Sequence, residues 1–350
     1  MEIRPIVSII IPVFNEEAII RENLLEISKY TVSLNQKYDF EIIVVNDGSS
    51  DNTGRIAEEL VKDHPKIKIF HHLVNLNLGN ALKTGFLHAN GTYAIVMDID
   101  LSYDVGHIEK LLSTIVTTQA DLVLASPYMP GGKVSAVPAL RRILSKGANR
   151  FLRLCAQEKF YTYTGMVRAY RTEFIKGMNL KTKDYEISAE ILYKSMILRG
   201  RIIEIPAHLD WSIQNKHKES RTSGIRLFRS FMSSLMSGFI YRPYVFFLGI
   251  GTILLIISLY MLIWVLIHTF SVMPLLAEST SFFDDRFSRA VAEVFRDRPH
   301  SFFVGGVLLF AAVQFFSLGF IALQNKRYFE ELFHISTNIN NANIVIKNRL

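Results

Sequence analysis

The stretch AIVMDIDLSYD, from Ala94 to Asp104, limits the fold of this chain more than any other part of the sequence. Its first four residues are apolar, which is typical of a buried parallel strand, and Asp98 and Asp100 follow at the carboxyl end of that strand. Because side chains alternate along an extended chain, the two carboxylates point to the same side. Ligands of open α/β sheets bind beyond such strand ends, where a carboxylate pair suits Mg²⁺ or Mn²⁺ with a diphosphate. The alternative interpretation is a loop with two solvated acids.

The surrounding sequence alternates between short β-branched runs and amphipathic segments. Strands are expected at 7–11, 41–45, 67–70, 121–125 and 202–205, and helices at 18–30, 53–62 and 80–89. Pro12 is expected to end the first strand, since proline cannot donate a hydrogen bond to a sheet. Strands that alternate with helices predict a parallel sheet with helices on both faces. The predicted fold class is therefore α/β, with a Rossmann-like, mainly parallel sheet.

The C-terminal part of the chain is rich in apolar residues. The runs 244–267 and 301–323 are each long enough, as helices rising about 1.5 Å per residue, to span about 30 Å of hydrocarbon. Before them, the segment 223–242 has apolar residues on one side and arginines near its start, which predicts a helix lying in the membrane interface. A packed amphipathic helix of the soluble domain and a buried pair of soluble helices are the respective alternatives.

These features divide the chain into four expected parts. They are an α/β domain at 1–222, an interfacial amphipathic helix at 223–242, a two-span transmembrane module at 243–325 and a tail at 326–350. Basic residues flank the outer ends of both spans, whereas the connecting loop is mixed in sign. The positive-inside rule therefore places the α/β domain and both termini in the cytoplasm, in a multi-pass protein of the cell membrane. The N-terminus lacks a basic segment followed by a long apolar run, so no cleaved signal peptide is expected.

The formal net charge of +7 raises the question of a nucleic-acid partner. No zinc-ligand spacing, RNP-like aromatic strand or recognition-helix pattern accompanies the basic residues, so we expect no nucleic acid. An anionic membrane face or an anionic substrate explains the charge better. Cys155 is the only cysteine, which excludes an internal disulfide and a cysteine metal cluster.

Four blocks in order, IIPVFNEE, VVNDGSSDNT, NLNLGNALKTGF and VMDIDLSYD, resemble the nucleotide-sugar-binding half of a family 2 glycosyltransferase with the GT-A fold. The resemblance implies a nucleoside pocket at Pro12, Phe14 and Glu16, a base contact at Asp47, and a site for the metal and the donor diphosphate at Asp98 and Asp100. Each residue has a structural alternative: Pro12 ends a strand, Phe14 belongs to the core, and Asp47 caps a helix.

The stretch SPYMPGGKVSAVPALRRILSKGANRFLR narrows the resemblance. Its pattern is similar to the dolichol-phosphate mannosyltransferase group and its bacterial polyprenyl-phosphate relatives. In that group the matching arginine and serine hold the phosphate of the acceptor lipid. The implied acceptor-phosphate residues are therefore Lys133, Arg141 and Ser145, joined by His217 and Arg221 near the end of the domain.

The sequence departs from the family pattern at several positions. An acid is replaced by Asn46, an arginine by Pro127, a glutamine by Ser102 and an aspartate by Tyr161, and His217 stands where an arginine usually precedes the final motif. These departures leave the identities of donor and acceptor open.

The resemblance implies inverting transfer of one sugar from a GDP- or UDP-linked donor to a polyprenyl phosphate, undecaprenyl or dolichyl, with Mg²⁺ or Mn²⁺ as cofactor. The expected catalytic residues are Asp98, Asp100 and Arg141. A phosphate acceptor needs no general base, whereas a hydroxyl acceptor would need one of Asp184, Glu186 and Glu190. Resemblance to two-span relatives also suggests a homo-oligomer. The alternatives are a processive polysaccharide synthase, disfavoured because its Q-x-x-R-W-type motif is missing, and a non-catalytic partner that binds nucleotide sugar or lipid.

Overall fold

The computed structural model describes residues 4–156, 158–212, 242–277 and 285–347. Two compact units divide the chain: one holds Met1–Tyr241 with Glu330–Leu350, and the other holds Arg242–Phe329. The predicted interfacial helix at 223–242 lies, except for its last residue, outside the described residues, and so do the candidate residues His217 and Arg221. The domain boundaries expected from the sequence stay predictions.

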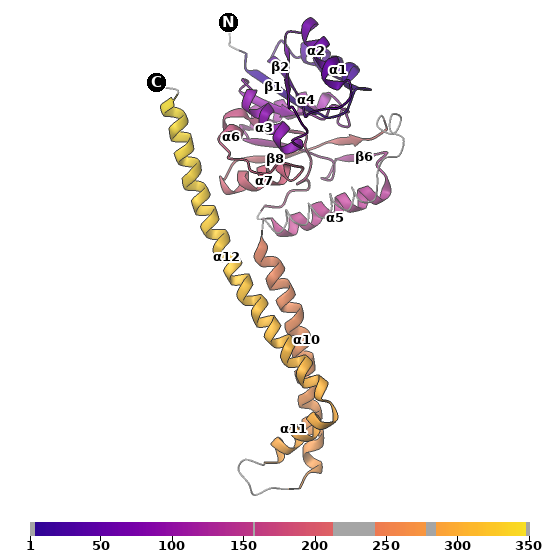
Figure 1. Cartoon of the computed structure of the whole chain (residues 1–350), viewed down its shortest axis with the longest axis vertical. Coiled ribbons are helices and arrows are strands. Elements are labelled where there is room, and N and C mark those ends of the chain that lie inside the picture. Colours follow the sequence, from indigo (N-terminus) through magenta and orange to yellow (C-terminus); the bar gives the residue numbers. More distant parts are fainter. Residues whose placement is uncertain (1–3, 157, 213–241, 278–284, 348–350) are drawn as a thin grey trace. The chain divides into compact units, whose positions relative to one another are not determined.

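The first unit is built on one seven-stranded sheet in the order β3-β2-β1-β4-β7-β5-β8 (Figure 1). Six strands are parallel to one another, and β7 runs antiparallel between β4 and β5. The strands are β1 (Ile6–Val13), β2 (Asp39–Asn46), β3 (Ile67–His71), β4 (Tyr93–Val96), β5 (Leu122–Ser126), β7 (Arg168–Arg171) and β8 (Ile202–Pro206). A second, two-stranded parallel sheet joins β6 (Lys133–Ser135) to β9 (His208–Asp210). The α/β class with a mainly parallel sheet is thereby confirmed.

Pro12 does not end the first strand, contrary to expectation, because β1 continues to Val13 and Pro12 pairs with Val45 of β2. Along β1, the carbonyl of Ile10 accepts from Met97 after β4, whereas the carbonyl of Val13 accepts from Asp47 after β2. With the alternation of an extended chain, Pro12 therefore turns its nitrogen towards β4. Pairing with β4 ends at Ile10, so the missing N–H interrupts no hydrogen bond of the sheet.

Helices cover both faces of the sheet, as the period-two pattern of β1 requires. Alternate residues of β1, including Ile9 and Ile11, belong to one buried cluster with residues of three helices, α1 (Ile20–Ser33), α2 (Thr53–Asp63) and α4 (Gly106–Thr118). On the other face, Gly85 of α3 (Leu78–His88) lies against Ile10; a Cβ at Gly85 would come within 2.3 Å of the Ile10 side chain. Among the described residues of this domain, the other helices are α5 (Ala139–Cys155), α6 (Thr172–Lys176) and α7 (Ile187–Ile197).

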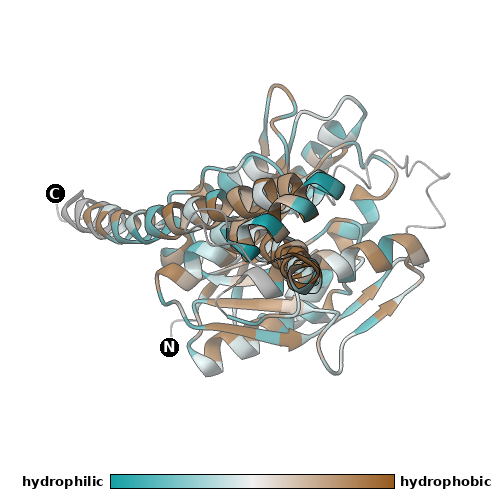
Figure 2. Cartoon of the chain, turned by 90° about the horizontal axis from the view of Figure 1, so that it is seen from below, coloured by the Kyte–Doolittle hydropathy of each residue, from teal (hydrophilic) through white to brown (hydrophobic). Residues whose placement is uncertain are grey.

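The second unit contains two long apolar helices, α10 (Pro243–Val272) and α12 (Pro299–Lys347), with α12 extending beyond this unit. Both are long and apolar enough to cross a membrane, and only 17% and 11% of their most apolar windows are buried inside the protein. Helices of a soluble core are mostly buried, so these helices indicate association with a membrane. Hydrophobic colours dominate the long helices, and hydrophilic ones increase towards the C-terminus of α12 (Figure 2).

Close packing joins the two long helices. Gly251 of α10 lies against Ala312 and Phe315 of α12, where a Cβ would come within about 3.3 Å of its neighbours. The hydroxyl of Ser258 donates to the carbonyl of Gly305 at 2.8 Å, and this serine is fully buried. Small residues at these positions let the helix backbones approach. A third helix, α11 (Arg286–Asp297), was not expected; the carboxylate of Asp285 caps it by accepting from the Ser288 N–H.

A buried carboxylate holds together the amino ends of three strands of the large sheet. Glu41 of β2 is 7% exposed and accepts from Ser8 of β1 at 2.7 Å, from Lys68 of β3 at 2.7 Å, and from the backbone N–H of Asn90 at 2.6 Å. Burial alone would raise the pKa of Glu41, but the hydrogen bonds outweigh it and lower the pKa below its ordinary value. The ionised form therefore stabilises the fold.

We expect Glu41→Gln to lower the free energy of unfolding by about 1.5–3 kcal/mol near pH 7, because the Ser8 hydroxyl and the backbone N–H of Asn90 lose a charged acceptor. Since the folded-state pKa is lowered, the contribution of Glu41 is complete above the unfolded-state pKa of about 4.3 and is lost as pH falls through the folded-state pKa. Thermal unfolding of the full chain in detergent at pH 4 and pH 7 measures the difference. The exposed Glu26→Gln is the matched control, and an equal effect of both changes would contradict the assignment.

Candidate functional site

The carboxyl ends of β1, β2 and β4 meet at one edge of the sheet, and the loops that follow them are bonded to one another. After β1, the backbone N–H of Asn15 donates to the Ser49 hydroxyl at 3.0 Å, and the side-chain oxygen Oδ1 of Asn15 accepts from the Ser50 N–H at 2.8 Å. The N–H of Glu16 donates to Thr53 at the start of α2 at 2.8 Å. Asn15 adopts a positive φ of 55° to make this turn, a conformation that asparagine tolerates better than most residues. These bonds fix the two loops beside the strand that carries the aspartate pair.

A tight turn after β4 positions Asp98 and Asp100. The carbonyl of Asp98 accepts from the Leu101 N–H at 3.3 Å, and Leu101 has a φ of 51°, in the left-handed region. The N–H of Ser102 donates to Asp100 Oδ1 at 2.9 Å, which orients that carboxylate. Asn23 of α1 donates to the carbonyl of Ile99 at 2.7 Å. A buried leucine with positive φ is costly, and such backbone strain is concentrated at functional sites.

The two aspartates lie in a negatively charged environment. Burial, followed by repulsion from Asp100 and Glu16, raises the pKa of Asp98 to about 8. The described residues contain no group of three His, Cys, Asp or Glu side chains that could hold a metal, so the protein offers a carboxylate pair. Carboxylate oxygens are the donors that Mg²⁺ and Mn²⁺ prefer, and a bound dication would offset the repulsion. The residues therefore fit a divalent cation whose remaining ligands come from a diphosphate and water.

A cavity of about 140 Å³ opens at the same edge of the sheet. Pro12, Phe14 and Asp47, which the sequence predicts for a nucleoside pocket, all line it. The other lining residues are Val13, Asn75, Asn77, Leu78, Ala81, Asp184 and Tyr185. Glu16 is not among them; its carboxylate instead lies close enough to Asp98 to raise its pKa.

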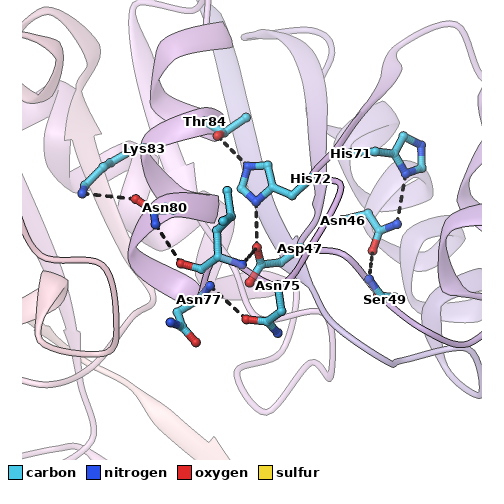
Figure 3. A network of polar contacts seen from close by, with 11 residues as sticks. Asn46, Asp47, Ser49, His71, His72, Asn75, Asn77, Asn80, Lys83 and Thr84 are labelled. Carbon is cyan, nitrogen blue, oxygen red and sulfur yellow. Dashed lines mark hydrogen bonds and ion pairs between the residues drawn. The ribbon is translucent and has the colours of Figure 1, made fainter.

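The segment that follows β3 holds the side chain of Asp47 beside this cavity (Figure 3). Asp47 is 4% exposed, and its Oδ1 lies 2.7 Å from His72 Nδ1 and accepts from the Leu76 N–H at 2.9 Å. The other ring nitrogen of His72 lies 2.8 Å from the Thr84 hydroxyl of α3. Asp47 therefore does not cap α2, which was the alternative interpretation, since its described bonds run to the segment after β3.

The replacement of an acid by Asn46 has a local explanation. The Asn46 amide lies 3.0 Å from His71 Nδ1, and its carbonyl oxygen accepts from the Ser49 N–H at 3.1 Å. His71 in turn lies 3.2 Å from Glu58 of α2 through Nε2. A carboxamide can both donate to an imidazole nitrogen and accept from a backbone N–H, whereas a carboxylate only accepts.

The acceptor candidates on α5, Arg141 and Ser145, each contact an aromatic side chain. The guanidinium of Arg141 stacks on the Trp211 ring at 4.0 Å. Burial lowers the pKa of Arg141, while Tyr185, Tyr128 and Asp100 oppose that shift, which places the arginine within electrostatic reach of Asp100. The hydroxyl of Tyr128 donates to Ser145 at 2.9 Å.

Lys133 is not joined to these residues by any contact in the described part of the chain. It is exposed at the start of β6, where its backbone N–H donates to the carbonyl of Ala207. The structure thus places Arg141 of α5 within electrostatic reach of Asp100, joins Ser145 of the same helix to Tyr128, and leaves Lys133 at the small sheet.

Two of the remaining family departures have visible structural roles. The N–H of Tyr161 donates to the Glu204 carboxylate at 2.9 Å, and the tyrosine ring lies under the Arg153 guanidinium at 4.3 Å. Ser102 is 5% exposed and uses its backbone to orient Asp100, so its side chain is not required for that bond. Nothing in the structure explains the replacement of arginine by Pro127.

The three acids considered as a general base differ in their surroundings. Glu190 pairs with Lys194 at 2.5 Å and accepts from the backbone N–H groups of Lys181 and Thr182, both at 2.8 Å. These hydrogen bonds outweigh burial and lower the pKa of Glu190, whose role is therefore structural. Asp184 lines the cavity, and Glu186 is the residue before the first turn of α7.

Sequence reasoning missed His72, Asn75, Asn77, Trp211 and Tyr128. The block NLNLGN, which carries both asparagines, was recognised as part of the family pattern, but no role was given to its members. His72 and Trp211 are brought to the site by contacts across long sequence distances, which no local periodicity reveals.

Glycosyl transferase family 2 matches residues 8–178. A dolichol-phosphate mannosyltransferase of Pyrococcus furiosus is 34% identical over 203 residues, which are 57% of this chain and 55% of that relative. A polyprenol monophosphomannose synthase of Mycolicibacterium smegmatis is 32% identical over 206 residues, which are 57% of this chain and 75% of that relative. The chain thus spans only about half of the first relative and three quarters of the second.

A cavity of about 140 Å³ and a carboxylate pair at the same edge of a mainly parallel sheet are typical of an α/β domain that binds its ligand at the carboxyl ends of the strands. The chain belongs to glycosyl transferase family 2. Among solved structures, mannosyl-3-phosphoglycerate synthase from Rubrobacter xylanophilus has a TM-score of 0.49 at 14% identity, with 67% of this chain and 72% of that one covered. A mannosyltransferase from Pyrobaculum calidifontis in complex with GDP-Man and Mn²⁺ has a TM-score of 0.44 at 14% identity, with 97% and 88% covered.

We expect the apparent Mn²⁺ affinity, measured by electron paramagnetic resonance with a nucleoside diphosphate present, to rise about tenfold per pH unit below pH 8. The reason is that Asp98, whose pKa is raised to about 8, must lose its proton before it binds a cation. Above pH 8 the affinity should level off, and Asp98→Asn should remove most of the binding. A constant affinity between pH 7 and 8 would contradict the assignment.

Proposed function

We propose that this protein transfers one sugar, with inversion, from a nucleotide-diphosphate sugar to a polyprenyl phosphate, producing a lipid-linked monosaccharide. The observation that carries the proposal is the proximity of Arg141 to Asp100, since it sets an anion-binding cation beside the carboxylate pair. The names of the relatives from Pyrococcus and Mycolicibacterium support the same acceptor class.

The proposed donor site runs from the cavity to the aspartate pair. Pro12, Phe14 and Asp47 contact the nucleoside, and Asp98 and Asp100 would hold Mg²⁺ or Mn²⁺ together with the diphosphate. The cation would neutralise the negative charge that develops on the departing diphosphate. The donor nucleotide is GDP or UDP.

The proposed acceptor site uses charge and alignment without a base. A phosphate monoester is already anionic at neutral pH, so one of its oxygens attacks the anomeric carbon without first losing a proton to a side chain. Arg141 binds that phosphate and screens its repulsion from the donor diphosphate, and Ser145 adds a hydrogen bond. Stacking on Trp211 limits the motion of the guanidinium and aligns it with its ligand. Lys133, His217 and Arg221 remain predicted contributors.

The proposed location follows from the apolar helices. With α10 and α12 spanning a cell membrane, the α/β domain would stand on the cytoplasmic side, where basic residues flank both spans. A polyprenyl phosphate carries its headgroup at the membrane surface, within reach of a domain anchored there. Association into a homo-oligomer through the spans is part of the proposal.

We expect purified protein with Mn²⁺ to move labelled sugar from one member of a nucleotide-sugar panel into an organic-extractable polyprenyl phosphate product. Asp100→Ala should reduce the rate by at least about 1,000-fold, because the carboxylate pair loses a cation ligand. Asp63→Ala, which removes an exposed carboxylate of α2, serves as the matched control.

Near-normal transfer by Asp100→Ala would remove the cation assignment. Metal-dependent nucleotide binding without any transfer would favour the non-catalytic alternative, and long glycan products would favour the processive synthase.

We expect Arg141→Ala to raise the KM for the polyprenyl phosphate by about tenfold or more, because an arginine–phosphate contact contributes about 1.5–3 kcal/mol. The KM for the donor should change little. Arg142→Ala is the matched control, since Arg142 is an exposed neighbour on the same helix. A larger change in the donor KM than in the acceptor KM would place Arg141 at the diphosphate instead.

A further inference from the structure

One carboxylate oxygen of Asp47, which lines the nucleoside cavity, already has hydrogen-bond partners within the protein. Oδ1 of Asp47 lies 2.7 Å from His72 Nδ1 and 2.9 Å from the donating N–H of Leu76. A carboxylate oxygen has two lone pairs, so these two partners fill its ordinary capacity. The carboxylate is 4% exposed, and the His72 side chain is 9% exposed. The pair is therefore well shielded from water.

The contact of His72 with α3 fixes this arrangement. Nε2 of His72 lies 2.8 Å from the Thr84 hydroxyl, so the imidazole is held at both nitrogens. An imidazole held in this way cannot rotate away from Asp47 without breaking both bonds. In Figure 3 the second oxygen of Asp47 points away from His72. Asp47 therefore offers a ligand in the cavity one carboxylate oxygen.

Carboxamides provide the other polar groups of this wall. Asn75 and Asn77 both line the cavity, and Asn75 Oδ1 accepts from the Asn77 N–H at 3.0 Å. This bond commits the oxygen of the Asn75 amide and leaves its NH₂ group to donate. In the part of the chain that the structure describes, no hydrogen bond uses that NH₂ group or the side chain of Asn77.

The backbone of Asn77, in the wall of the cavity, adopts a strained conformation. Asn77 has φ 69° and ψ 164°, a combination that is otherwise almost restricted to glycine. The strained residue directly precedes α3, and the next glycine, Gly79, donates its N–H to the carbonyl of Lys183 at 2.9 Å. Backbone strain of this kind persists only where the surrounding structure imposes it. At Asn77 the surrounding structure is the wall of the nucleoside cavity.

The bases of common nucleotides differ in the hydrogen-bond partners that they need from a binding site. Guanine presents two adjacent donors, N1–H and the 2-amino group, which pair best with both oxygens of one carboxylate. Uracil presents a single donor, N3–H, between two carbonyl oxygens. One carboxylate oxygen in a cavity wall that also carries carboxamide donors matches the uracil edge, and it leaves one guanine donor without a partner.

We infer that His72 holds Asp47 in a position that makes this cavity a uracil site, so that the donor is a UDP-sugar. The inference rests on the proposed function in assigning the cavity to the donor nucleotide. His72 acts through Asp47 and is a positioning residue, whereas Asn75 and Asp47 contact the base.

The test is nucleotide binding to the full chain in detergent with Mn²⁺, measured by isothermal titration calorimetry with UDP, GDP, CDP and ADP. We expect UDP to bind at least tenfold more tightly than GDP. In His72→Leu, UDP affinity should fall about tenfold while GDP affinity changes less than threefold, since Asp47 can then turn both oxygens to the cavity. His72→Asn should recover part of the preference, because its amide can donate to Asp47.

The adjacent His71→Leu is the matched control, since His71 contacts Asn46 and Glu58 and not Asp47. If the unmodified protein binds GDP as tightly as UDP, the base assignment is overturned, whatever the variants do. A preference for UDP that survives in folded His72→Leu would overturn the role of His72. If His72→Leu fails to fold, the comparison of His72→Asn with His71→Leu decides the same question.

Activity separates this inference from the proposed function. With an active UDP-sugar, His72→Asn should raise the donor KM and leave kcat within twofold. Tight UDP binding without lipid transfer would refute the proposed function and leave the base assignment intact. Lipid transfer from GDP-sugars alone would refute the base assignment and leave the proposed function intact.

Discussion

The mutual repulsion of three carboxylates is the constraint on which this structure depends most. Burial, followed by repulsion from Asp100 and Glu16, raises the pKa of Asp98 to about 8. Each of the three carboxylates comes from a different position on the sheet edge or its loops. The fold holds them there through the Asn15 turn, the left-handed Leu101 and the Ser102 N–H. A cluster that is unfavourable alone becomes favourable when a dication and its diphosphate bind. The same rigidity keeps the cluster ready before they arrive.

Much of the sheet and the positions of the aspartates could be predicted, because both depend on local sequence. Buried parallel strands read as continuous apolar runs, and the residues that follow them must lie at one edge. The prediction that Pro12 ends the strand is wrong, because a proline interrupts pairing only with the strand that its nitrogen faces. Pro12 faces β4, where pairing has already ended at Ile10, and it still pairs with β2 on the other side. The short β6, β7 and β9 and the helix α11 were not expected, since segments of three or four residues or mixed charge carry little periodic signal.

The polar environment of the site was less predictable than its acids. Asp47 could be named from its turn, but the bond to His72 joins residues that are 25 positions apart. The stacking of Arg141 on Trp211 likewise joins a helix to the end of the domain. Such contacts depend on the order of the strands in the sheet. This order cannot be predicted from the sequence of each strand alone. Glu190 shows the opposite case, where a carboxylate that looked available is bound by Lys194.

The antiparallel strand β7 has a consequence for how the chain folds during synthesis. β4, which leads into the aspartate pair, is bordered on one side by β1 and on the other by β7, which is made more than 70 residues later. Until residues 168–171 leave the ribosome, β4 is an unprotected sheet edge that another chain can join. The strand that carries the site is therefore closed late, after α5 and the loops around it exist. Chains that stall or are truncated before this point would expose β4, whose residues Ala94, Ile95 and Val96 are fully buried in the complete fold, to aggregation.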